Sequence, residues 1–568
     1  MDMNKHAING GPTECPAGEG APHYGAIVVG AGFGGLYALK KLKCDLGLET
    51  LLLEQGGGVG GTWYWNRYPG AMSDTRSHLY CYSFDKQLLQ EDSFANHYRY
   101  QPEVRGYLEA FVDRYSLRGD IKLHTQVTGA QFDEAAGVWT VRTAAGEAFT
   151  CRYLITALGV LSKINFPNID GIDRFKGELI HTGRWPEGAS CKGKRVGIIG
   201  TGSTGVQVVT AVASEVESLT VFQRSAQYSV PAGDGPVSDE FLQGIKENYE
   251  EIWRNEKNTL TAFGAKESDI PAMSVSAEER ERVFEDAWQE GGGFRFMFGT
   301  FSDIITDEAA NEAAADFIRR KIAKIVKDPV KAAKLTPTDY YVKRPLCDAG
   351  YYQQFNRPNV DVVDIKNNPI REITEKGILT EDGVEHELDM LIFATGFDAC
   401  DGNYLRMDIR GKGGLPIQDL WRDGARSYLG VIARDFPNMF MLLGPNSPFS
   451  NIPPALETQV DLIGDLVHRS IESGGPIVEV GEAGVEEWVQ HCTELANGTL
   501  LTRSESSWFF GANIPGKPFT VIFYMGGLKG YRQILSELAE ADYPALTFSP
   551  APSGVAVDAE PEVVGRVS

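Results

Sequence analysis

The sequence predicts an α/β protein with two Rossmann-like domains and a helical insertion in the second of them. A unit of strand, glycine turn, helix and strand begins near residue 26, and a second such unit begins near residue 195. Charged sequence with helical periodicity then fills about 235–335. The chain has 568 residues, more than the roughly 250–300 that a single core reaches, so two or three cores are expected.

The first unit has the pattern of a dinucleotide-binding turn. A short apolar strand at 26–29 runs into Gly30, Gly32 and Gly35, which form G-x-G-x-x-G ahead of a helical segment. The first two glycines permit a tight turn close to a pyrophosphate, and the third lets the helix pack on the strand. Glu54 ends the next strand, where a carboxylate can accept both ribose hydroxyls. A glycine loop without a ligand is the alternative, but strand, helix and acid together favour a nucleotide.

The second unit repeats the turn with a different ending. Gly200, Gly202 and Gly205 follow a strand at 195–199, and the next strand ends near Arg224 instead of an acid. A carboxylate there would repel a 2′-phosphate, whereas an arginine can bind one bidentately, so NADP is favoured over NAD. An arginine that only caps the strand is the alternative. Two nucleotides on one chain indicate a flavin enzyme that uses a nicotinamide cofactor, hence FAD and NADPH.

The domain boundaries follow from these units. An apolar strand at 389–393 ends in small residues far from the first unit, which suggests that the chain returns there to its first domain. We therefore expect a discontinuous FAD-binding domain and an NADP-binding domain between its parts. The predicted ranges are 24–160 plus 390–547 for FAD, 161–389 for NADP with its insertion at about 235–335, and disordered tails at 1–23 and 548–568.

Bulk properties exclude several functions. A net charge of −23 argues against nucleic acid and anionic membranes, since both need a basic surface. No apolar run approaches the roughly 20 residues that span a bilayer, and the N-terminus lacks the apolar core of a signal peptide. The eight cysteines are scattered without a C-x-x-C pair, which predicts reduced thiols in a cytoplasmic protein and no metal site.

Three further features have both structural and functional interpretations. The loop from Gly60 to Gly70 is rich in glycine and aromatic residues, typical of a wall around a flavin but equally of a packed core loop. Adjacent Lys343 and Arg344 usually form a solvated surface, yet here they are candidates to bind the NADP phosphate and to stabilise an oxygen anion. His181 is more often structural than a base, and Asp74 could be an ordinary cap.

Two longer motifs carry a resemblance to a known family. One motif, [A/G]-G-T-W-x-x-x-x-Y-P-[G/M]-x-x-x-D, is met from Gly60 to Asp74. The other, F-x-G-x-x-x-H-x-x-x-W-P, is met by Phe175, Gly177, His181, Trp185 and Pro186. Both look like fingerprints of the type I Baeyer–Villiger monooxygenases, which the chain resembles over about 24–545, with most similarity to the cyclohexanone monooxygenases. The resemblance associates the second fingerprint with coupling of the domains.

The resemblance implies a reaction and a set of residues. NADPH, O2 and FAD would insert one oxygen beside a ketone carbonyl by way of a C4a-peroxyflavin, giving lactones from cyclic ketones. Arg344 matches the arginine that stabilises the reacting anions, and Asp74 matches its carboxylate partner. The implied FAD contacts are Gly30, Gly32, Gly34, Gly35, Glu54, Thr62, Trp63, Tyr64, Trp65, Asp74, Tyr80, Val127 and Ile452. The implied NADP contacts are Met72, Ser73, Asp74, Thr201, Gly202, Ser203, Thr204, Gly205, Val206, Gln207, Arg224, Ser225, Lys343, Arg344 and Trp508, and the implied substrate pocket is Val160, Leu161, Phe449, Ser450, Ile452 and Phe523.

Some positions depart from the family pattern and leave alternatives open. Cyclohexanone monooxygenases usually have Gly-Pro-Phe-Thr-Asn-Leu where this chain has Ser-Pro-Phe-Ser-Asn-Ile at 447–452, and Val160 replaces a common leucine. Ring size and enantiopreference therefore stay open. Oxygenation of nitrogen or sulfur nucleophiles is an alternative activity, as is a flavin reductase, although the dithiol type would need paired cysteines. The expected partners are a small ketone and O2, with neither nucleic acid nor membrane, and the expected state is a monomer.

Overall fold

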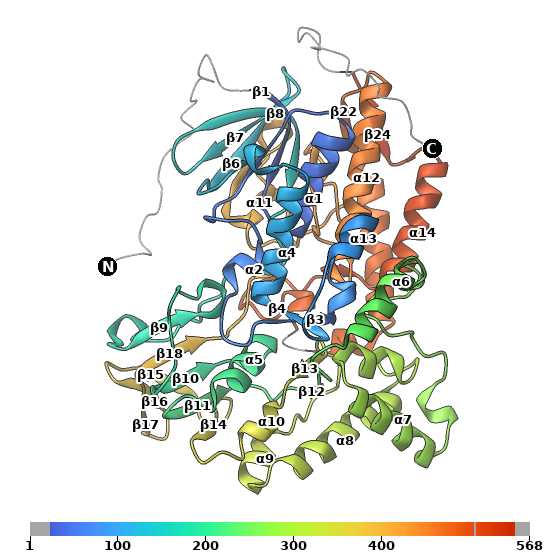
Figure 1. Ribbon diagram of the computed structural model, residues 1–568. Helices are drawn as coiled ribbons and strands as arrows, with labels where there is room; N and C mark the ends of the chain where they lie inside the picture. Colours follow the sequence, from blue (N-terminus) through green and yellow to red (C-terminus); the bar gives the residue numbers. More distant parts are fainter. Residues whose placement is uncertain (1–22, 505–506, 551–568) are drawn as a thin grey trace.

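The computed structural model describes residues 23–504 and 507–550 and contains two main sheets. The larger sheet has eight strands in the order β19-β6-β7-β8-β1-β2-β5, with β20 paired to β8. It lies at the top of Figure 1, beside the helices that cover it. Its strands are β1 (His23–Val29), β2 (Thr50–Leu53), β5 (Ile121–Lys122), β6 (Val127–Asp133), β7 (Val138–Thr143), β8 (Ala148–Thr156), β19 (Asp408–Arg410) and β20 (Met439–Met441).

The first predicted unit is the parallel pair β1–β2 joined by helix α1 (Phe33–Lys40). Every residue of α1 except Lys40 is buried, so the helix sits in the core and not on a surface. Gly30 has a φ of +107°, and a Cβ at Gly35 would lie 1.8 Å from the Gly30 carbonyl oxygen. A side chain at Gly35 would therefore separate α1 from β1, and one at Gly30 would strain the backbone and meet the Ala157 carbonyl oxygen at 2.4 Å.

The second sheet is wholly parallel, in the order β14-β11-β10-β18-β9, and lies at lower left in Figure 1. Helix α5 (Ser203–Val212) follows its central strand, and a Cβ at Gly205 would lie 2.3 Å from the Gly200 carbonyl oxygen. The same steric requirement thus operates in both units. The strands are β9 (Glu178–His181), β10 (Arg195–Ile199), β11 (Ser218–Gln223), β14 (Val360–Asp364) and β18 (Met390–Phe393).

Strand β18 corrects one expectation. Met390–Phe393 pairs with β10 and β9 in the second sheet, so the chain has not yet returned to the first domain at residue 390. The first strand to rejoin the larger sheet is β19, which pairs with β6. An apolar run predicts that a strand is buried, but it does not name the neighbours of that strand.

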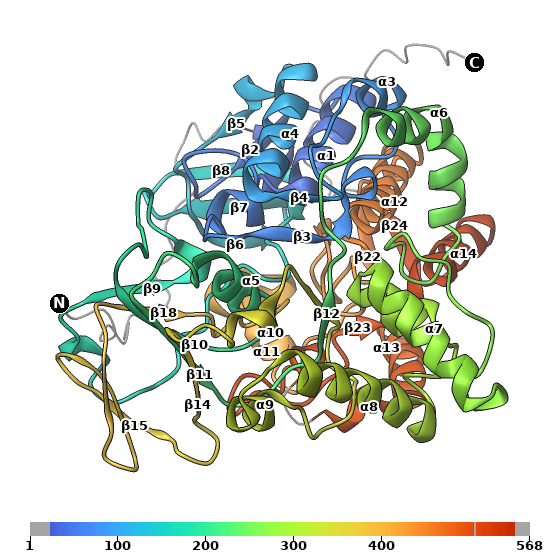
Figure 2. The same ribbon diagram turned by 60° about the horizontal axis from the view of Figure 1, so that its bottom comes forward.

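Helices occupy the segment where the sequence predicted them, but they divide between two cores. Helices α7 to α9 pack with the second sheet, whereas Tyr249 and Trp253 of α6 belong to the core of the larger sheet. Figure 2 shows α6 beside α3 (Lys86–Glu91) and α7 and α8 farther down. The helices are α6 (Asp239–Glu256), α7 (Ala277–Glu290), α8 (Glu308–Ile325) and α9 (Pro329–Leu335).

The last described residues return to the first domain. Strands β22 (Ile477–Val480) and β24 (Leu546–Ser549) pair antiparallel, so Phe548 and Ser549 belong to a strand and not to the predicted tail. His23, the last residue of the predicted N-terminal tail, likewise belongs to β1. Residues 1–22 and 551–568 of the predicted tails lie outside the described residues. The remaining helices are α2 (Thr62–Trp65), α4 (Gln101–Arg114), α10 (Tyr351–Gln354), α11 (Ile417–Leu420), α12 (Ile452–Glu472), α13 (Glu482–Asn497) and α14 (Gly527–Glu540).

Short strand pairs complete the description. In Figure 1, β3, β4, β12 and β13 lie between the two main sheets, whereas β15, β16 and β17 lie at the outer edge of the second sheet. They are β3 (Met72–Arg76) with β4 (Tyr98–Tyr100), β12 (Ser229–Pro231) with β13 (Leu346–Asp348), β21 (Ser447–Pro448) with β23 (Phe523–Tyr524), and the group β15 (Ile370–Ile373), β16 (Gly377–Thr380) and β17 (Glu385–Glu387).

Two chain segments connect the domains side by side. Ile164 and Phe397 form an antiparallel bridge, and the Asn165 amide donates to the Gly396 carbonyl at 3.0 Å. We call segments 157–166 and 394–403 the linkers. The chain also passes between the domains on either side of α6, so the linkers are one of two places where the domains are connected.

Candidate active site between the two domains

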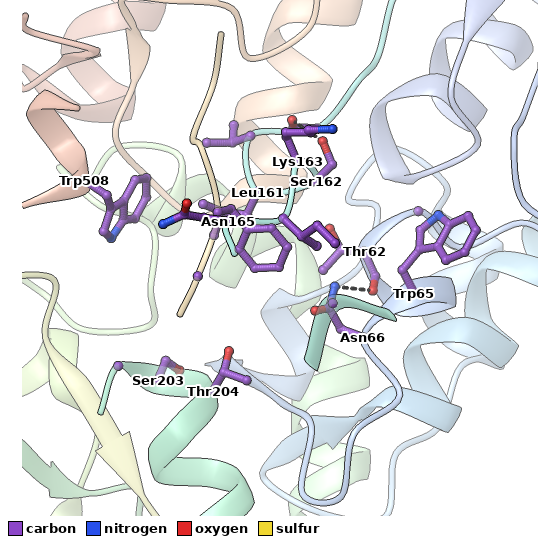
Figure 3. A pocket seen from close by; sticks show the side chains of 18 of the residues that line it. Thr62, Trp65, Asn66, Leu161, Ser162, Lys163, Asn165, Ser203, Thr204 and Trp508 are labelled. Carbon is purple, nitrogen blue, oxygen red and sulfur yellow. Dashed lines mark hydrogen bonds between the residues drawn. The ribbon is translucent and has the colours of Figure 1, made fainter. Parts of the chain in front are cut away.

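A cavity of about 1090 Å³ lies between the sheets and is lined from both domains. Figure 3 shows Ser203 and Thr204 at the start of α5 on one side, Thr62, Trp65 and Asn66 on another, and the linker residues Leu161, Ser162, Lys163 and Asn165 above them. Trp508 enters from a separate segment. This volume is slightly above the usual range for a small-molecule site, so the cavity has room for extended ligands such as nucleotides.

The first domain offers a nucleotide cradle on its side of the cavity. Glu54 is buried, and its carboxylate accepts the amides of Ala31 at 2.8 Å and Gly56 at 2.7 Å. Burial raises the pKa of Glu54, and the two amide bonds oppose that shift. Helix α1 begins at Gly32 without a side-chain cap, and its amides face the cavity. These residues fit the FAD that the motif implies, because uncapped amides bind phosphate and a fixed carboxylate binds ribose.

The second domain offers a matching cradle. Helix α5 begins at Gly202 without a side-chain cap, and a Cβ there would meet no atom within 4 Å. Thr201 Oγ1 donates to the Ser225 carbonyl at 2.8 Å, which holds the turn beside Arg224. Arg224, Ser225 and Lys343 all line the cavity, as the NADP prediction requires.

Gln207 ties the second cradle to the first domain. Its amide donates to the Met72 carbonyl at 3.0 Å, and its oxygen accepts the Tyr68 hydroxyl at 2.8 Å. A residue predicted as an NADP contact is therefore also a contact between the domains.

The predicted pair Arg344 and Asp74 is an ion pair in the structure. Asp74 comes from β3 and its side chain is 7% exposed, whereas Arg344 precedes β13 and is 25% exposed. The guanidinium carbon of Arg344 lies 5.5 Å from the ring centroid of Phe294. Asp74 thus anchors a cation that lines the cavity, while an aromatic ring supports its face.

Aromatic side chains wall the cavity next to this pair. Phe263 and Phe294 stack in parallel with centroids 3.6 Å apart, and Phe449 lies 6.2 Å from Phe294. Phe523 lies 5.9 Å from Phe449. Val160, Leu161, Ser450 and Ile452, which the resemblance places in the substrate pocket, also line the cavity, whereas Ser447 is buried behind it.

The structure brings most predicted residues together but leaves some outside the cavity lining. Tyr64 turns away, and its hydroxyl accepts the Gly57 amide at 3.0 Å. Gly35, Gly205 and Val206 lie behind the cavity wall, where the two glycines let a helix approach its strand and Val206 is buried in the core. The remaining predicted residues line the cavity apart from the fingerprint Phe175, Gly177, His181, Trp185 and Pro186.

The fingerprint lies against the linkers. The His181 ring is 5.1 Å from the Phe166 ring and 6.0 Å from the Phe397 ring, one from each linker region. Its Nδ1 accepts the Gly183 amide at 3.0 Å, and burial lowers the pKa of His181 to about 4. Trp185 is buried in the core of the second domain. A neutral, enclosed histidine suits packing against the linkers better than proton transfer.

Several residues of the cavity wall carry no signal in the sequence. Phe263 and Phe294 come from the helical insertion, where aromatic residues normally indicate a core. Lys163 and Asn165 come from a linker with no motif. Arg184 occupies a position that the fingerprint leaves unspecified.

Comparisons with known proteins agree with this site. A family model described as flavin-binding monooxygenase-like matches residues 25–231. The cyclohexanone 1,2-monooxygenase of an Acinetobacter species is 55% identical over 92% of this chain and 96% of its own. The phenazine N-monooxygenase of Lysobacter antibioticus is 52% identical over 94% of this chain and 98% of its own. The crystal structure of a cyclohexanone monooxygenase from Rhodococcus sp. Phi1 bound to NADP+ superposes with a TM-score of 0.93, at 55% identity over 94% of this chain and 100% of its own.

The chain belongs to the flavin-binding monooxygenases. Within them it is a Baeyer–Villiger monooxygenase of the cyclohexanone monooxygenase type, and its cofactors are FAD and NADPH. Among residues 23–504 and 507–550, no helix is long and apolar enough to cross a membrane, and no three His, Cys, Asp or Glu side chains form a group able to hold a metal ion.

Proposed function

We propose that this enzyme converts cyclic ketones to lactones, with Arg344 as the catalytic cation and Asp74 as the residue that positions it. The observation that carries the proposal is the anchored Arg344–Asp74 pair on the wall of an aromatic cavity reached by both nucleotide cradles. When bound, FAD and NADPH supply the reducing electrons and the activation of O2.

The residues of the chain supply charge, orientation and exclusion of water. A guanidinium stays protonated at any physiological pH, so Arg344 can stabilise an oxygen anion without readily giving it a proton. The ion pair with Asp74 limits the directions that the guanidinium can take. The rings of Phe263, Phe294 and Phe449 enclose an apolar space in which such a charge interacts strongly.

A ketone panel tests the proposal. Purified holoenzyme would be given NADPH, O2 and unsubstituted cyclic ketones of increasing ring size, with lactone and hydrogen peroxide both measured. We expect lactone in proportion to the NADPH consumed for at least one ring size. NADPH consumption that yields only hydrogen peroxide across the panel would refute the assignment.

A second candidate function is oxygenation of an aromatic nitrogen. The phenazine N-monooxygenase at 52% identity favours it, and a flat heterocycle could stack in a cavity walled by Phe263 and Phe294. The turnover of phenazine to its N-oxide, divided by that of cyclohexanone to lactone under the same conditions, separates the two candidates.

We also propose a cytoplasmic monomer. The seven described cysteines are all free thiols, and six of them are buried, which supports a reducing compartment. Light scattering after gel filtration tests the oligomeric state, and a mass of two chains would refute the monomer.

A further inference from the structure

Arg184 connects the fingerprint to the opposite wall of the cavity. It ends the short helical turn Thr182–Arg184, directly after strand β9 of the second domain. Its guanidinium carbon lies 3.9 Å from the ring centroid of Trp65, which belongs to α2 of the first domain. Both residues line the cavity. One side chain therefore joins the two domains at the ligand site.

The charge of Arg184 has no ion-pair partner in the described part of the chain. Its guanidinium donates one hydrogen bond, from Nη1 to the Gly183 carbonyl at 3.0 Å. The side chain is half-buried, and burial lowers the pKa of Arg184, while the nearby Glu54 carboxylate opposes that shift. A guanidinium carries five N–H donors, so most of them are available to a ligand.

A second cation adds to the same region. Lys163, on the linker, also lines the cavity and forms no ion pair among residues 23–504 and 507–550. Burial lowers the pKa of Lys163, and the charges of Arg406 and Arg184 lower it further. Figure 3 places Lys163 on the linker and Trp65 on α2. The charge of Asp398 raises the pKa of Lys163, but that carboxylate is already paired with Arg406 and Lys517. Two partly buried cations without an ion-pair partner on one cavity wall favour an anionic ligand beside them.

The neighbours of Arg184 identify which nucleotide supplies that anion. Trp65 and Glu54 both belong to the first domain, and Glu54 is the carboxylate expected to hold a ribose. Arg224 and Lys343, the candidate cations for the NADP 2′-phosphate, are not among the charges that shift the pKa of Arg184, and Lys343 pairs with Asp339 at 2.7 Å. The nucleotide beside Arg184 is therefore the one bound by the first domain.

We propose that Arg184 is a binding residue for FAD, contacting its ribose–diphosphate portion while stacked on Trp65. The second domain thereby holds the flavin nucleotide of the first, and the fingerprint contributes a cofactor contact in addition to its packing against the linkers. Arginine suits this role because its planar cation can stack on an indole and bind an oxyanion at the same time.

Arg67 provides a matched control. It is half-buried, its guanidinium carbon lies 4.8 Å from the Tyr64 ring centroid, and its Nε donates to the Tyr64 carbonyl at 3.1 Å. It differs from Arg184 in lying outside the cavity lining. Replacing either by glutamine removes a charge and a stacked cation, but only Arg184→Gln removes a cation from the cavity.

The experiment measures FAD binding to the apoprotein by quenching of flavin fluorescence, at low and high salt. We expect Arg184→Gln to raise the Kd for FAD about tenfold or more at low salt and to weaken its salt dependence, as loss of one charge-assisted contact predicts. Arg67→Gln should match the wild type. Arg184→Lys should retain part of the salt dependence of FAD binding but not the full affinity. If the glutamine variant fails to fold, the lysine variant takes its place in the test.

Two results would overturn the proposal. In one, Arg184→Gln and Arg67→Gln bind FAD equally well. In the other, Arg184→Gln keeps its FAD affinity but loses affinity for NADP+, which would assign the cation to the other nucleotide. Neither measurement needs a ketone, so the proposed lactone formation can fail or succeed independently.

Discussion

Replacing Arg344 by alanine should separate the two halves of the reaction. Arg344 is three-quarters buried and its partner Asp74 almost wholly so, which places both charges largely out of water. Two unit charges about 4 Å apart interact by about 4 kcal/mol at an effective dielectric constant near 20. Loss of one such cation beside a reacting oxyanion typically lowers the rate by about 10²–10³, or roughly 3–4 kcal/mol. We expect that loss in lactone formation, while reduction of the flavin by NADPH stays measurable.

A double-mutant cycle then tests the role of Asp74. If Asp74 acts through Arg344, Asp74→Asn should lower the rate of lactone formation less than Arg344→Ala does. A loss of about 10–100-fold is typical when a carboxylate that orients a functional group is removed. The double variant should form lactone no more slowly than Arg344→Ala alone, because Asp74 has no cation to position once Arg344 is removed. Stopped-flow absorbance gives flavin reduction, and product analysis gives lactone.

Arg295 supplies the control for this cycle. Its side chain is 27% exposed and paired with Glu290 at 2.9 Å, which resembles Arg344, but it does not line the cavity. Arg295→Ala should leave lactone formation within a few fold of the wild type. The reasoning is refuted if Arg344→Ala lowers flavin reduction and lactone formation equally, or if the losses of the two single variants multiply in the double variant.

Three further predictions test other parts of the site. The methyl group of Gly202→Ala meets no protein atom, so the variant should fold with normal FAD content, but this methyl group enters the second cradle and should raise the KM for NADPH at least tenfold. Gly106→Ala, on a helix with equal space, should change neither FAD content nor KM. An unchanged KM in Gly202→Ala would remove Gly202 from the NADP site. Phe263→Ala removes the ring stacked on Phe294 and should shift the preference towards larger ketones, measured as a ratio of kcat/KM values; an unchanged ratio would mean that Phe263 does not bound the substrate space. Burial lowers the pKa of His181 to about 4 in the folded protein, against about 6.5 in the unfolded chain. The neutral ring therefore contributes its full stability above pH 6.5, and the free energy of unfolding falls by at most about 3 kcal/mol as the pH drops towards 4. His181→Gln should flatten this part of the curve of unfolding free energy against pH, and identical curves would contradict an enclosed neutral histidine.

Local features of the sequence predict the two cradles well. The glycine turns, the helices after them and Glu54 lie within one strand–helix–strand unit, so their geometry depends on backbone sterics over a few residues. Tyr64 shows the limit of a motif. Successive residues on a helical turn point about 100° apart, so Thr62, Trp63, Tyr64 and Trp65 cannot all face one cavity.

Other parts of the site depend on contacts between distant segments. Strand β18 is recognisable from its apolar residues, but its position between β9 and β10 follows from the way the sheet assembles. Phe263 and Phe294 reach the cavity only because part of the helical insertion packs back against the first domain. No spacing in the sequence records such an approach.

The position of Arg184 depends both on a local sequence motif and on contacts between distant segments. The fingerprint fixes the turn that carries it, since His181 packs on the linkers and Trp185 on the core of the second domain. The residue at position 184 itself is free to vary in the motif, so its charge is a property of this chain. A fixed turn with a variable side chain, aimed across a domain junction at Trp65, allows cofactor affinity to change without altering the linkers. Arg184→Gln should weaken FAD binding and leave unchanged the dependence of the unfolding free energy on pH that His181 causes. That result would show that Arg184 binds the cofactor while His181 packs against the linkers, so the two functions of this segment are separate.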